Sequence, residues 1–161
     1  MYLIFDTETT GLPQNFNAPI TDSNNWPRMV QIAWQLHDDE GKLIENQDYI
    51  IKPEGYDIPF NATRIHGIST KMAKEEGKDL AWVLEEFKKA LEKTKVGVGH
   101  NIDFDYKIVG AEFFRKELYH FWSIPKNLFC IRFVFFFYII IYVYISPFIF
   151  NHGIFSYSHE K

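Results

Sequence analysis

The segment from Tyr2 to Gly11 (Tyr-Leu-Ile-Phe-Asp-Thr-Glu-Thr-Thr-Gly) restricts the fold of this chain more than any other. It begins as an apolar run without alternation, which is typical of a buried central strand. Asp6 and Glu8 follow at a spacing of two, and side chains two apart on a strand point to the same face. Two adjacent carboxylates repel each other and raise at least one pKa unless a cation lies between them. The alternative is a strand that ends in a polar turn, with both acids solvated.

Length, charge and cysteine content limit the class of protein. At 161 residues and 19.1 kDa, the chain is long enough for one domain with a substantial core. Its net charge of −4 argues against non-specific coating of nucleic acid, but the carboxylates of a metal site would also make a nucleic-acid enzyme acidic. Cys130 is the single cysteine, which excludes an internal disulfide and favours a reducing, cytoplasmic location. No signal peptide is expected, because the N-terminus passes directly into a predicted strand.

Residues 1–126 have the pattern of an α/β domain with a mixed sheet, since strands come first and helices then alternate with strands. The strands are expected at 1–5, 29–37, 42–51 and 96–99. The helices are expected at 70–76 after the cap Ser69, in a longer segment after the cap Asp79, and from about 102 to 118 after the cap Asn101. The segment after Asp79 has an apolar stripe of helical period, formed by Leu80, Val83, Leu84, Phe87, Ala90 and Leu91. Residues 14–26 are expected to form a surface loop, and residues 53–61 an irregular segment.

A second acidic site lies far downstream, in Gly99-His100-Asn101-Ile102-Asp103-Phe104-Asp105. A strand is expected to pass into a helix there, with Asp105 in the first helical turn. An acid in that position complements the helix dipole, which would account for Asp103. It accounts less well for a bulky Phe104 between two acids at a strand-to-helix switch, where α/β sheets tend to bind ligands.

Three motifs in this order resemble those of the DEDD exonuclease superfamily: Phe5-Asp6-Thr7-Glu8-Thr9-Thr10-Gly11, then Ile65-His66-Gly67-Ile68-Ser69, then His100-Asn101-Ile102-Asp103-Phe104-Asp105. The similar branch includes the proofreading epsilon subunit of DNA polymerase III and ribonuclease T. The resemblance covers about residues 1–126. It implies a ribonuclease H-like mixed sheet flanked by helices, and hydrolysis of nucleotides from DNA or RNA 3′ ends. The implied partners are a single-stranded 3′ end and a DNA polymerase subunit.

The resemblance also implies roles for individual residues. Asp6, Glu8 and Asp105 would be catalytic carboxylates that bind two Mg²⁺ or Mn²⁺ ions, with Asp6 bridging them, and hard cations prefer such oxygen ligands. One ion would help to turn water into a nucleophile, while the other stabilises the leaving oxygen. The implied substrate contacts are Thr9, Thr10, Leu12, His66 and Phe104. For Leu12 and Phe104, plain packing in the core or at its rim is an equal alternative. For His66, the alternative is a hydrogen bond within its own loop.

The fourth carboxylate and the general base of the family are missing from the sequence. The resemblance places them on a late helix, as His-x-x-x-x-Asp or Tyr-x-x-x-Asp, and no Asp follows Asp105. His100 and Asp105 have the first spacing, but they already belong to the second motif. Loss of a general base lowers a rate by about 10²–10⁴-fold. We therefore expect a truncated domain with little or no exonuclease activity, and the alternative is an inactive nucleic-acid-binding remnant.

Residues 127–161 differ abruptly from the rest, because half of the 16 phenylalanines follow Lys126. We considered three interpretations of this apolar tail. Residues 133–150 are just long enough for a membrane anchor, which needs roughly 17–25 residues, and this anchor would tether the protein to a membrane. Phe, Ile, Tyr and Val also favour β-strands. The third interpretation is a frameshift in an A/T-rich gene, since such codons specify Phe, Ile, Tyr, Asn and Lys. We favour the frameshift, which would leave the C-terminal part of the fold missing or replaced.

Overall fold

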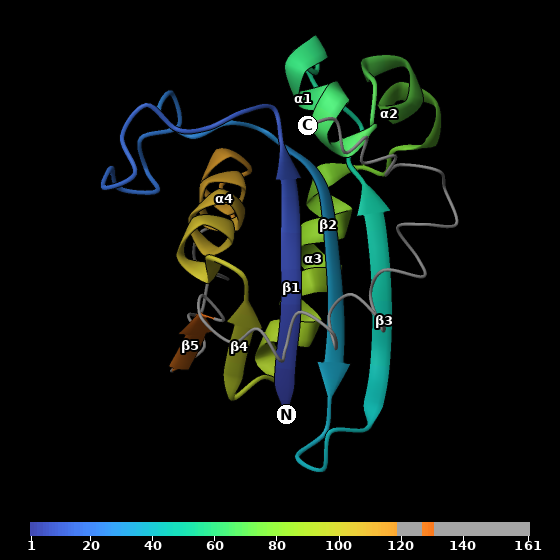
Figure 1. Cartoon of the computed structure of the whole chain (residues 1–161), viewed down its shortest axis with the longest axis vertical. Coiled ribbons are helices and arrows are strands. Elements are labelled where there is room, and N and C mark those ends of the chain that lie inside the picture. Colours follow the sequence, from blue (N-terminus) through green and yellow to red (C-terminus); the bar gives the residue numbers. More distant parts are fainter. Residues whose placement is uncertain (119–126, 131–161) are drawn as a thin grey trace, which may run out of the picture. The chain divides into compact units, whose positions relative to one another are not determined.

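The computed structural model describes residues 1–118 and 127–130, and their main feature is a five-stranded mixed sheet (Figure 1). The strand order is β3-β2-β1-β4-β5. The strands are β1 (Tyr2–Thr9), β2 (Met29–His37), β3 (Leu43–Ile50), β4 (Val96–Gly99) and β5 (Asn127–Cys130). Strand β2 runs antiparallel to both β1 and β3, whereas β4 runs parallel to β1, and β5 to β4. The mixed sheet expected from the order of the elements is confirmed.

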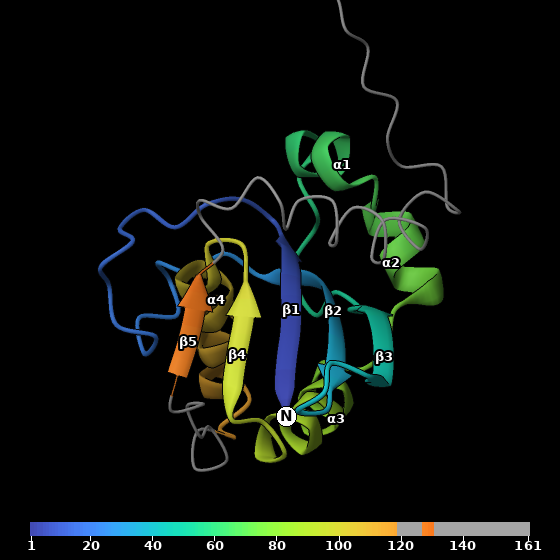
Figure 2. The ribbon, with the colours of Figure 1, turned by 60° about the horizontal axis from the view of Figure 1, so that its bottom comes forward.

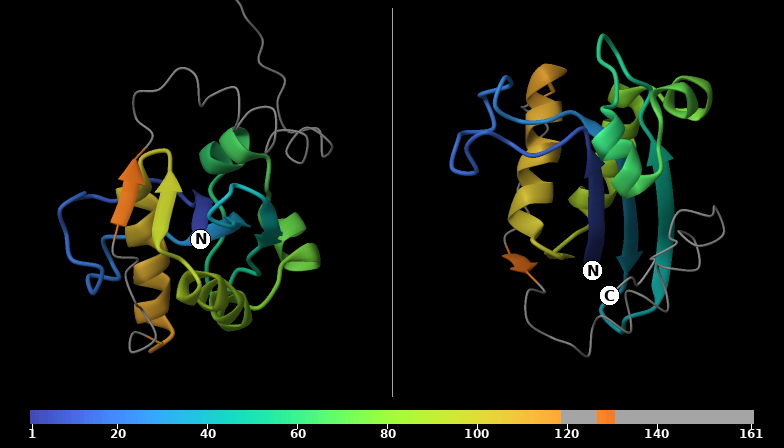
Figure 3. Two further views of the ribbon diagram at one scale, coloured as in Figure 1. Left: turned by 90° about the horizontal axis from the view of Figure 1, so that it is seen from below. Right: turned by 45° about the horizontal axis from the view of Figure 1, so that its top comes forward.

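Two of the four described helices build the main core with the sheet. The helices are α1 (Phe60–His66), α2 (Thr70–Glu76), α3 (Leu80–Glu92) and α4 (Ile102–Arg115). Helices α3 and α4 pack against the face of β1 that carries Leu3 and Phe5 (Figures 2 and 3). Helices α1 and α2 form a smaller apolar cluster, which includes Val30, Ile58 and Ile68. Helix α1 lies near the C-terminal end of β1, the end that carries the acidic residues (Figure 1).

The amphipathic pattern of α3 is confirmed, since every residue of its predicted apolar stripe is buried. The Phe87 ring lies edge-on to Phe5 and Trp34, with ring centroids 5.2 and 5.3 Å away. Such aromatic pairs contribute about 0.5–1.5 kcal/mol each beyond the area that they bury. The predicted caps of α2 and α3 are confirmed as well, because the side chains of Ser69 and Asp79 accept backbone hydrogen bonds from Met72 and Trp82.

Helix α4 differs from the expectation at both ends. Asn101 occupies the N-cap position, but its backbone is left-handed with φ 56° and its side chain makes no capping hydrogen bond. The helix ends at Arg115 and not near Leu118, because Glu117 adopts φ 57°. The N–H groups of Glu117 and Leu118 then donate to the carbonyls of Phe114 and Phe113, which is the Schellman arrangement. Glycine usually marks this arrangement in a sequence, and here the position is occupied by glutamate.

Helix α1 lies partly within the segment that we expected to be irregular. It has only seven residues, and its N-cap, Pro59, makes no side-chain hydrogen bond. It ends at Gly67, which adopts the left-handed conformation at φ 80° and donates its N–H to the Thr63 carbonyl. A proline before a helix and a glycine after it is a known signature, but this helix is too short to show a clear apolar period.

The C-terminal expectations concern mostly residues that the structure does not describe. Strand β5 lies beyond the expected boundary at residue 126 and extends the sheet by pairing with β4. The apolar segment 131–161, with its three interpretations, lies outside the described residues, as do His120, His152 and His159. Among residues 1–118 and 127–130, no helix has the length and apolar character needed to cross a membrane.

Candidate carboxylate site

Strand β1 carries Asp6 and Glu8 on one face, as their spacing predicts. Leu3, Phe5 and Thr7 alternate with them and are buried on the other face. Both acids lie within the strand and not in a turn after it, because β2 pairs with β1 as far as Thr9. The side chain of Asp6 is exposed, and that of Glu8 is half-buried. The alternative of a strand that ends in a polar turn before the acids is therefore wrong, although Asp6 is exposed as that alternative expected.

A β-bulge interrupts the pairing of β1 with β2 next to Glu8. Glu8 pairs with Gln31 and Thr9 with Met29, so Val30 is the extra residue on β2. Val30 is fully buried in the small cluster beneath α1 and α2. Bulges are frequent beside active sites, where they redirect a side chain or end a pairing. Here the bulge lies at the last two residue pairs of β1 with β2, directly beside the second acid.

Asp105 approaches β1 from the first turn of α4. Its Oδ1 atom accepts one hydrogen bond from the Thr7 backbone N–H (3.0 Å) and another from the Thr7 hydroxyl (2.6 Å). The backbone donor is available because the pairing of β1 with β4 ends at Ile4. The Asp105 side chain is only 2 % exposed. Asp105 therefore reaches the strand between the two other acids, at the end of β4.

Desolvation raises the pKa values of all three carboxyl groups, including that of Asp6, although much of this residue is exposed. The charge of Asp6 adds to the shift at Glu8 and at Asp105. Loss of solvent raises the pKa of Asp6 to about 6, and nearby His100 opposes this shift. The pKa of Glu8 rises to about 7, first through desolvation and then through the charge of Asp6. Desolvation and Asp6 together raise the pKa of Asp105 to about 8, although the hydrogen bonds from Thr7 act in the opposite direction. Around neutral pH the three groups therefore share fewer than three negative charges.

The chemistry of these donors fits a hard divalent cation. All three side chains offer oxygen only, which Mg²⁺ and Mn²⁺ prefer. Besides desolvation, the charge of Asp6 raises the pKa values of Glu8 and Asp105, and a cation between these groups would relieve that repulsion. Within the described ranges, no three His, Cys, Asp or Glu side chains are gathered closely enough to form a finished metal centre. Both hydrogen bonds from Thr7 go to Oδ1 of Asp105, so Oδ2 is the oxygen that would contact a cation.

The residues after Glu8 form the rim of the site. The Thr9 hydroxyl donates to the Gly11 carbonyl at 2.7 Å, and the Thr10 hydroxyl accepts from the Arg28 N–H at 3.0 Å. Both threonines are half-buried. Leu12 is 74 % exposed, so its packing in the core is excluded. The structure therefore leaves the Leu12 side chain free for contact with a ligand.

His66 and Phe104 lie on different elements, His66 at the end of α1 and Phe104 in the first turn of α4. His66 is 5 % exposed, and its Nδ1 accepts the Ile68 N–H at 3.1 Å, so the hydrogen bond within its own loop is confirmed. Burial lowers the pKa of His66, while the nearby Thr9 backbone acts in the opposite direction. Among the described residues, Nε2 has no hydrogen-bond partner of regular geometry. Phe104 packs at the edge of the main core, 6.3 Å from the Phe16 ring.

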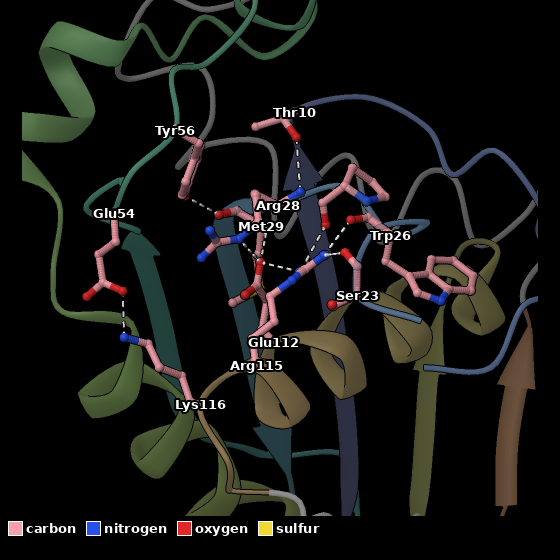
Figure 4. A network of polar contacts seen from close by, with 11 residues as sticks. Thr10, Ser23, Trp26, Arg28, Met29, Glu54, Tyr56, Glu112, Arg115 and Lys116 are labelled. Atoms are coloured by element: carbon pink, nitrogen blue, oxygen red, sulfur yellow. Dashed lines mark hydrogen bonds and ion pairs between the residues drawn. The ribbon is translucent and has the colours of Figure 1, made fainter. Parts of the chain in front are cut away.

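Two features of the site were not predicted from the sequence. His100 acts electrostatically on Asp6, and its place directly after β4 is the signal that could have indicated this. Glu112 on α4 is fully buried and bonds to Arg28, Met29 and Arg115 (Figure 4). A buried acid on the apolar face of a helix is visible in a sequence, but its partners are distant along the chain.

The mixed sheet flanked by helices is the ribonuclease H-like fold of exonucleases. The chain belongs to the RNase T family of exonucleases, whose family model matches residues 3–132. It is 34 % identical over 118 residues to a PolC-type DNA polymerase III of Streptococcus thermophilus, covering 73 % of this chain. The corresponding enzyme of Streptococcus mutans is 32 % identical over the same length. The chain spans about 7 % of the length of each of these relatives.

Solved structures of exonuclease I share the fold. Escherichia coli exonuclease I in complex with a dT13 oligonucleotide superimposes with a TM-score of 0.63 at 24 % identity, covering 80 % of this chain and 27 % of that one. Exonuclease I of Methylocaldum szegediense gives a TM-score of 0.64 at 24 % identity, with 81 % and 27 % covered. The sheet and helices therefore correspond to about a quarter of these larger enzymes.

Proposed function

We propose that this domain removes nucleotides from the 3′ end of single-stranded DNA with Mg²⁺ or Mn²⁺, and that hydrolysis by these 161 residues is slow. One observation supports this most strongly. Asp6, Glu8 and Asp105 lie at one end of β1 in an exonuclease-family fold. Desolvation raises the pKa values of all three carboxyl groups, and the charge of Asp6 raises those of Glu8 and Asp105 further. This is the electrostatic situation that a bound divalent cation stabilises.

Each site residue has a proposed task. Asp6, Glu8 and Asp105 would hold the cations, which supply a nucleophilic water and stabilise the leaving oxygen. Thr9 and Thr10 are half-buried residues, and their backbone would contact the terminal nucleotide. The exposed Leu12 would pack against the base of this nucleotide. We propose that the side chains of His66 and Phe104 border the same nucleotide. Aromatic and apolar contacts of this type tolerate any base.

The slow rate follows from the residues that the sequence lacks. No Asp follows Asp105, so the fourth carboxylate and its neighbouring base are not supplied by these residues. Proton transfer without a positioned base is about 10²–10⁴-fold slower. The same observation favours a second candidate function, in which the domain binds single-stranded ends and does not cleave them.

The relatives support DNA as substrate and a polymerase as partner. Structures of exonuclease I contain bound DNA oligonucleotides, including dT13 and dA16. The curated relatives are PolC-type DNA polymerases III. We therefore propose that the domain acts on ends made during DNA synthesis, in contact with a polymerase. RNA ends remain the competing substrate, which the assay below includes.

The test is an end-labelled nuclease assay with Mn²⁺ at a high protein concentration. A 5′-labelled single strand should shorten slowly to a ladder of products, and a matched RNA strand should shorten less. Asp6→Ala and EDTA should each stop the reaction, while Asp103→Ala, which changes a neighbouring exposed acid, should not. Metal-dependent binding without any shortening would support the second candidate function, and release of the 5′ label as a mononucleotide would contradict the 3′ polarity.

A further inference from the structure

Two buried acids on α4 contact the acidic strand and its partner strand. Asp105 contacts β1, and Glu112 contacts the start of β2. Asp105 and Glu112 are seven residues apart, which places them about two turns apart on one face of the helix. Asp105 accepts its two hydrogen bonds from Thr7. Glu112 accepts from Arg28 Nε and from the Met29 N–H, both at 2.9 Å. The first acid thus contacts β1 before Glu8, and the second contacts the chain that pairs with β1 after Glu8.

Arg28 links Glu112 to Thr10, which lies two residues after Glu8. Its N–H donates to the Thr10 hydroxyl at 3.0 Å, and the Thr10 N–H donates to its carbonyl at 2.9 Å. These two hydrogen bonds close a ring directly beyond the bulge between Glu8 and Thr9. The Arg28 guanidinium also lies 4.3 Å from the centre of the Tyr56 ring (Figure 4).

Tyr56 holds the same chain from the other side. Its hydroxyl donates to the Met29 carbonyl at 3.1 Å. Burial is the main reason why the pKa of Tyr56 rises to about 12, which keeps this hydroxyl a donor at any ordinary pH. Both backbone groups of Met29 thus have side-chain partners, Glu112 for the N–H and Tyr56 for the carbonyl. Met29, the first residue of β2, is thereby held by a side chain from α4 and by one from the segment between β3 and α1.

Helix α4 also holds the rest of the β1–β2 loop, residues 10–28. Arg115 forms an ion pair with Glu112 at 3.0 Å and donates to the carbonyls of Ser23, Trp26 and Pro27. Lys107, one turn from the start of the helix, donates to the Phe16 carbonyl at 2.9 Å. The loop that follows the acidic strand is therefore fastened to α4 at several points. Three of these loop contacts are made by Arg115, the ion-pair partner of Glu112.

The charges of this network make a purely stabilising role a poor explanation. Glu112 is 0 % exposed and faces two arginines, and within the described part of the chain its Oε2 has no hydrogen-bond partner. Buried ion pairs contribute little net stability compared with apolar groups of similar size, and their best-attested use is to fix one arrangement. Here the arrangement that is fixed is the end of the acidic strand.

We propose that Glu112 is a positioning residue, which sets the backbone of Thr9 and Thr10 beside Glu8 through Arg28 and Met29. The consequence for catalysis rests on the proposed function, but the placement of the backbone does not. Amide hydrogen exchange therefore tests the placement separately from nuclease activity. The informative amides are those of Thr10 and Arg28, whose hydrogen bonds to each other depend on Glu112 in this proposal.

The experiment compares Glu112→Gln with the matched control Glu54→Gln by amide exchange in the full chain. Gln keeps one oxygen that can accept from Arg28 and Met29, but it removes the negative charge that pairs with Arg28 and Arg115 and makes these bonds charge-assisted. Glu54 pairs with Lys116, the residue after α4, and in the described part of the chain no hydrogen bond or ion pair joins it to Thr10 or Arg28. In Glu112→Gln, we expect the Thr10 and Arg28 amides to exchange at least about tenfold faster, while the Thr7 amide changes less than about twofold. In Glu54→Gln, all three amides should keep their protection.

Unchanged exchange at Thr10 and Arg28 in folded Glu112→Gln would overturn the proposal, as would an equal loss at Thr7. If Glu112→Gln does not fold, Arg28→Lys tests the same contact, because lysine keeps the charge but not the Nε hydrogen bond or the stacking on Tyr56. Where nuclease activity is measurable, Glu112→Gln should raise KM for the single strand more than it lowers kcat. A chain without any activity would refute the proposed function and would leave the exchange result to decide on Glu112.

Discussion

Asp105 accepts both the backbone N–H and the hydroxyl of Thr7, the residue that lies between Asp6 and Glu8. This contact joins the first turn of α4 to the acidic strand at the point where β4 no longer pairs with it. It brings a third carboxylate to the two on β1, where desolvation and then the charge of Asp6 raise the pKa of Asp105. In the absence of a cation, this arrangement should reduce the stability of the fold.

We expect Asp105→Asn to stabilise the metal-free chain and to remove its response to metal. The Asn Oδ1 can still accept both hydrogen bonds from Thr7, while the buried charge is lost. At pH 8 in EDTA, Tm should rise by at least about 3 °C. Thermal unfolding followed by circular dichroism measures this shift. An unchanged or lower Tm would show that the Asp105 charge does not oppose folding.

The stability of the metal-free chain should fall as the pH rises from about 4 to about 8. A carboxyl with a raised pKa binds more protons in the native than in the unfolded state between the two pKa values, so stability decreases across that interval. The pKa of Asp105 rises from 3.8 to about 8 and that of Glu8 from 4.5 to about 7, mainly through burial. Urea unfolding at several pH values in EDTA checks this. A stability maximum at pH 8 would contradict it.

Removal of the His66 side chain should loosen the loop after α1. His66→Ala leaves the Ile68 N–H without its acceptor, and an unsatisfied buried donor costs about 1–3 kcal/mol. Urea unfolding should show this loss, and the surface variant Arg64→Ala on the same helix serves as the control. If His66 also borders the bound nucleotide, single-strand binding should weaken in His66→Ala. A loss of stability below about 0.5 kcal/mol would contradict the structural part of this prediction.

Gly99→Ala should disturb the turn that leads into α4. A Cβ at position 99 would lie 2.9 Å from the Phe5 carbonyl oxygen and 2.7 Å from Ile102 Cδ1, so the backbone of β1 or of the turn has to move. Overpacking of this type typically costs about 1–3 kcal/mol. Asp105 lies in the first turn of α4, directly after this turn, so a displaced backbone should also displace its carboxyl group. We therefore expect the metal-induced rise in Tm to become smaller as well. A variant with unchanged Tm would show that the turn has more room than the structure indicates.

The elements that the sequence predicted well are those whose signal is local. Helix α3 follows from its apolar stripe, α2 from Ser69 and Gly77, and β2 from its hydrophobic pattern with bounds that agree at both ends. The elements that it missed depend on backbone conformations that no residue type announces. Glu117 ends α4 in a conformation usual for glycine, and Asn101 starts it without a side-chain cap.

The candidate site was predictable in its residues but not in its support. The motifs around Asp6, Glu8 and Asp105 pointed to the acids, and the fold brings them to one end of β1. Their roles as ligands stay a prediction. The contact of Glu112 with Arg28 joins residues 84 positions apart, so only the tertiary fold reveals it.

Isothermal titration with Mn²⁺ at pH 8 tests the central claim, that these three carboxylates bind divalent cations, most directly. The chain should bind Mn²⁺ and release protons, because carboxyl groups with raised pKa values must ionise to act as ligands. Asp6→Asn should abolish most of this heat, and Asp103→Asn, which changes an exposed acid on the same helix as Asp105, should retain it. Equal Mn²⁺ binding by the chain and by Asp6→Asn would contradict the account.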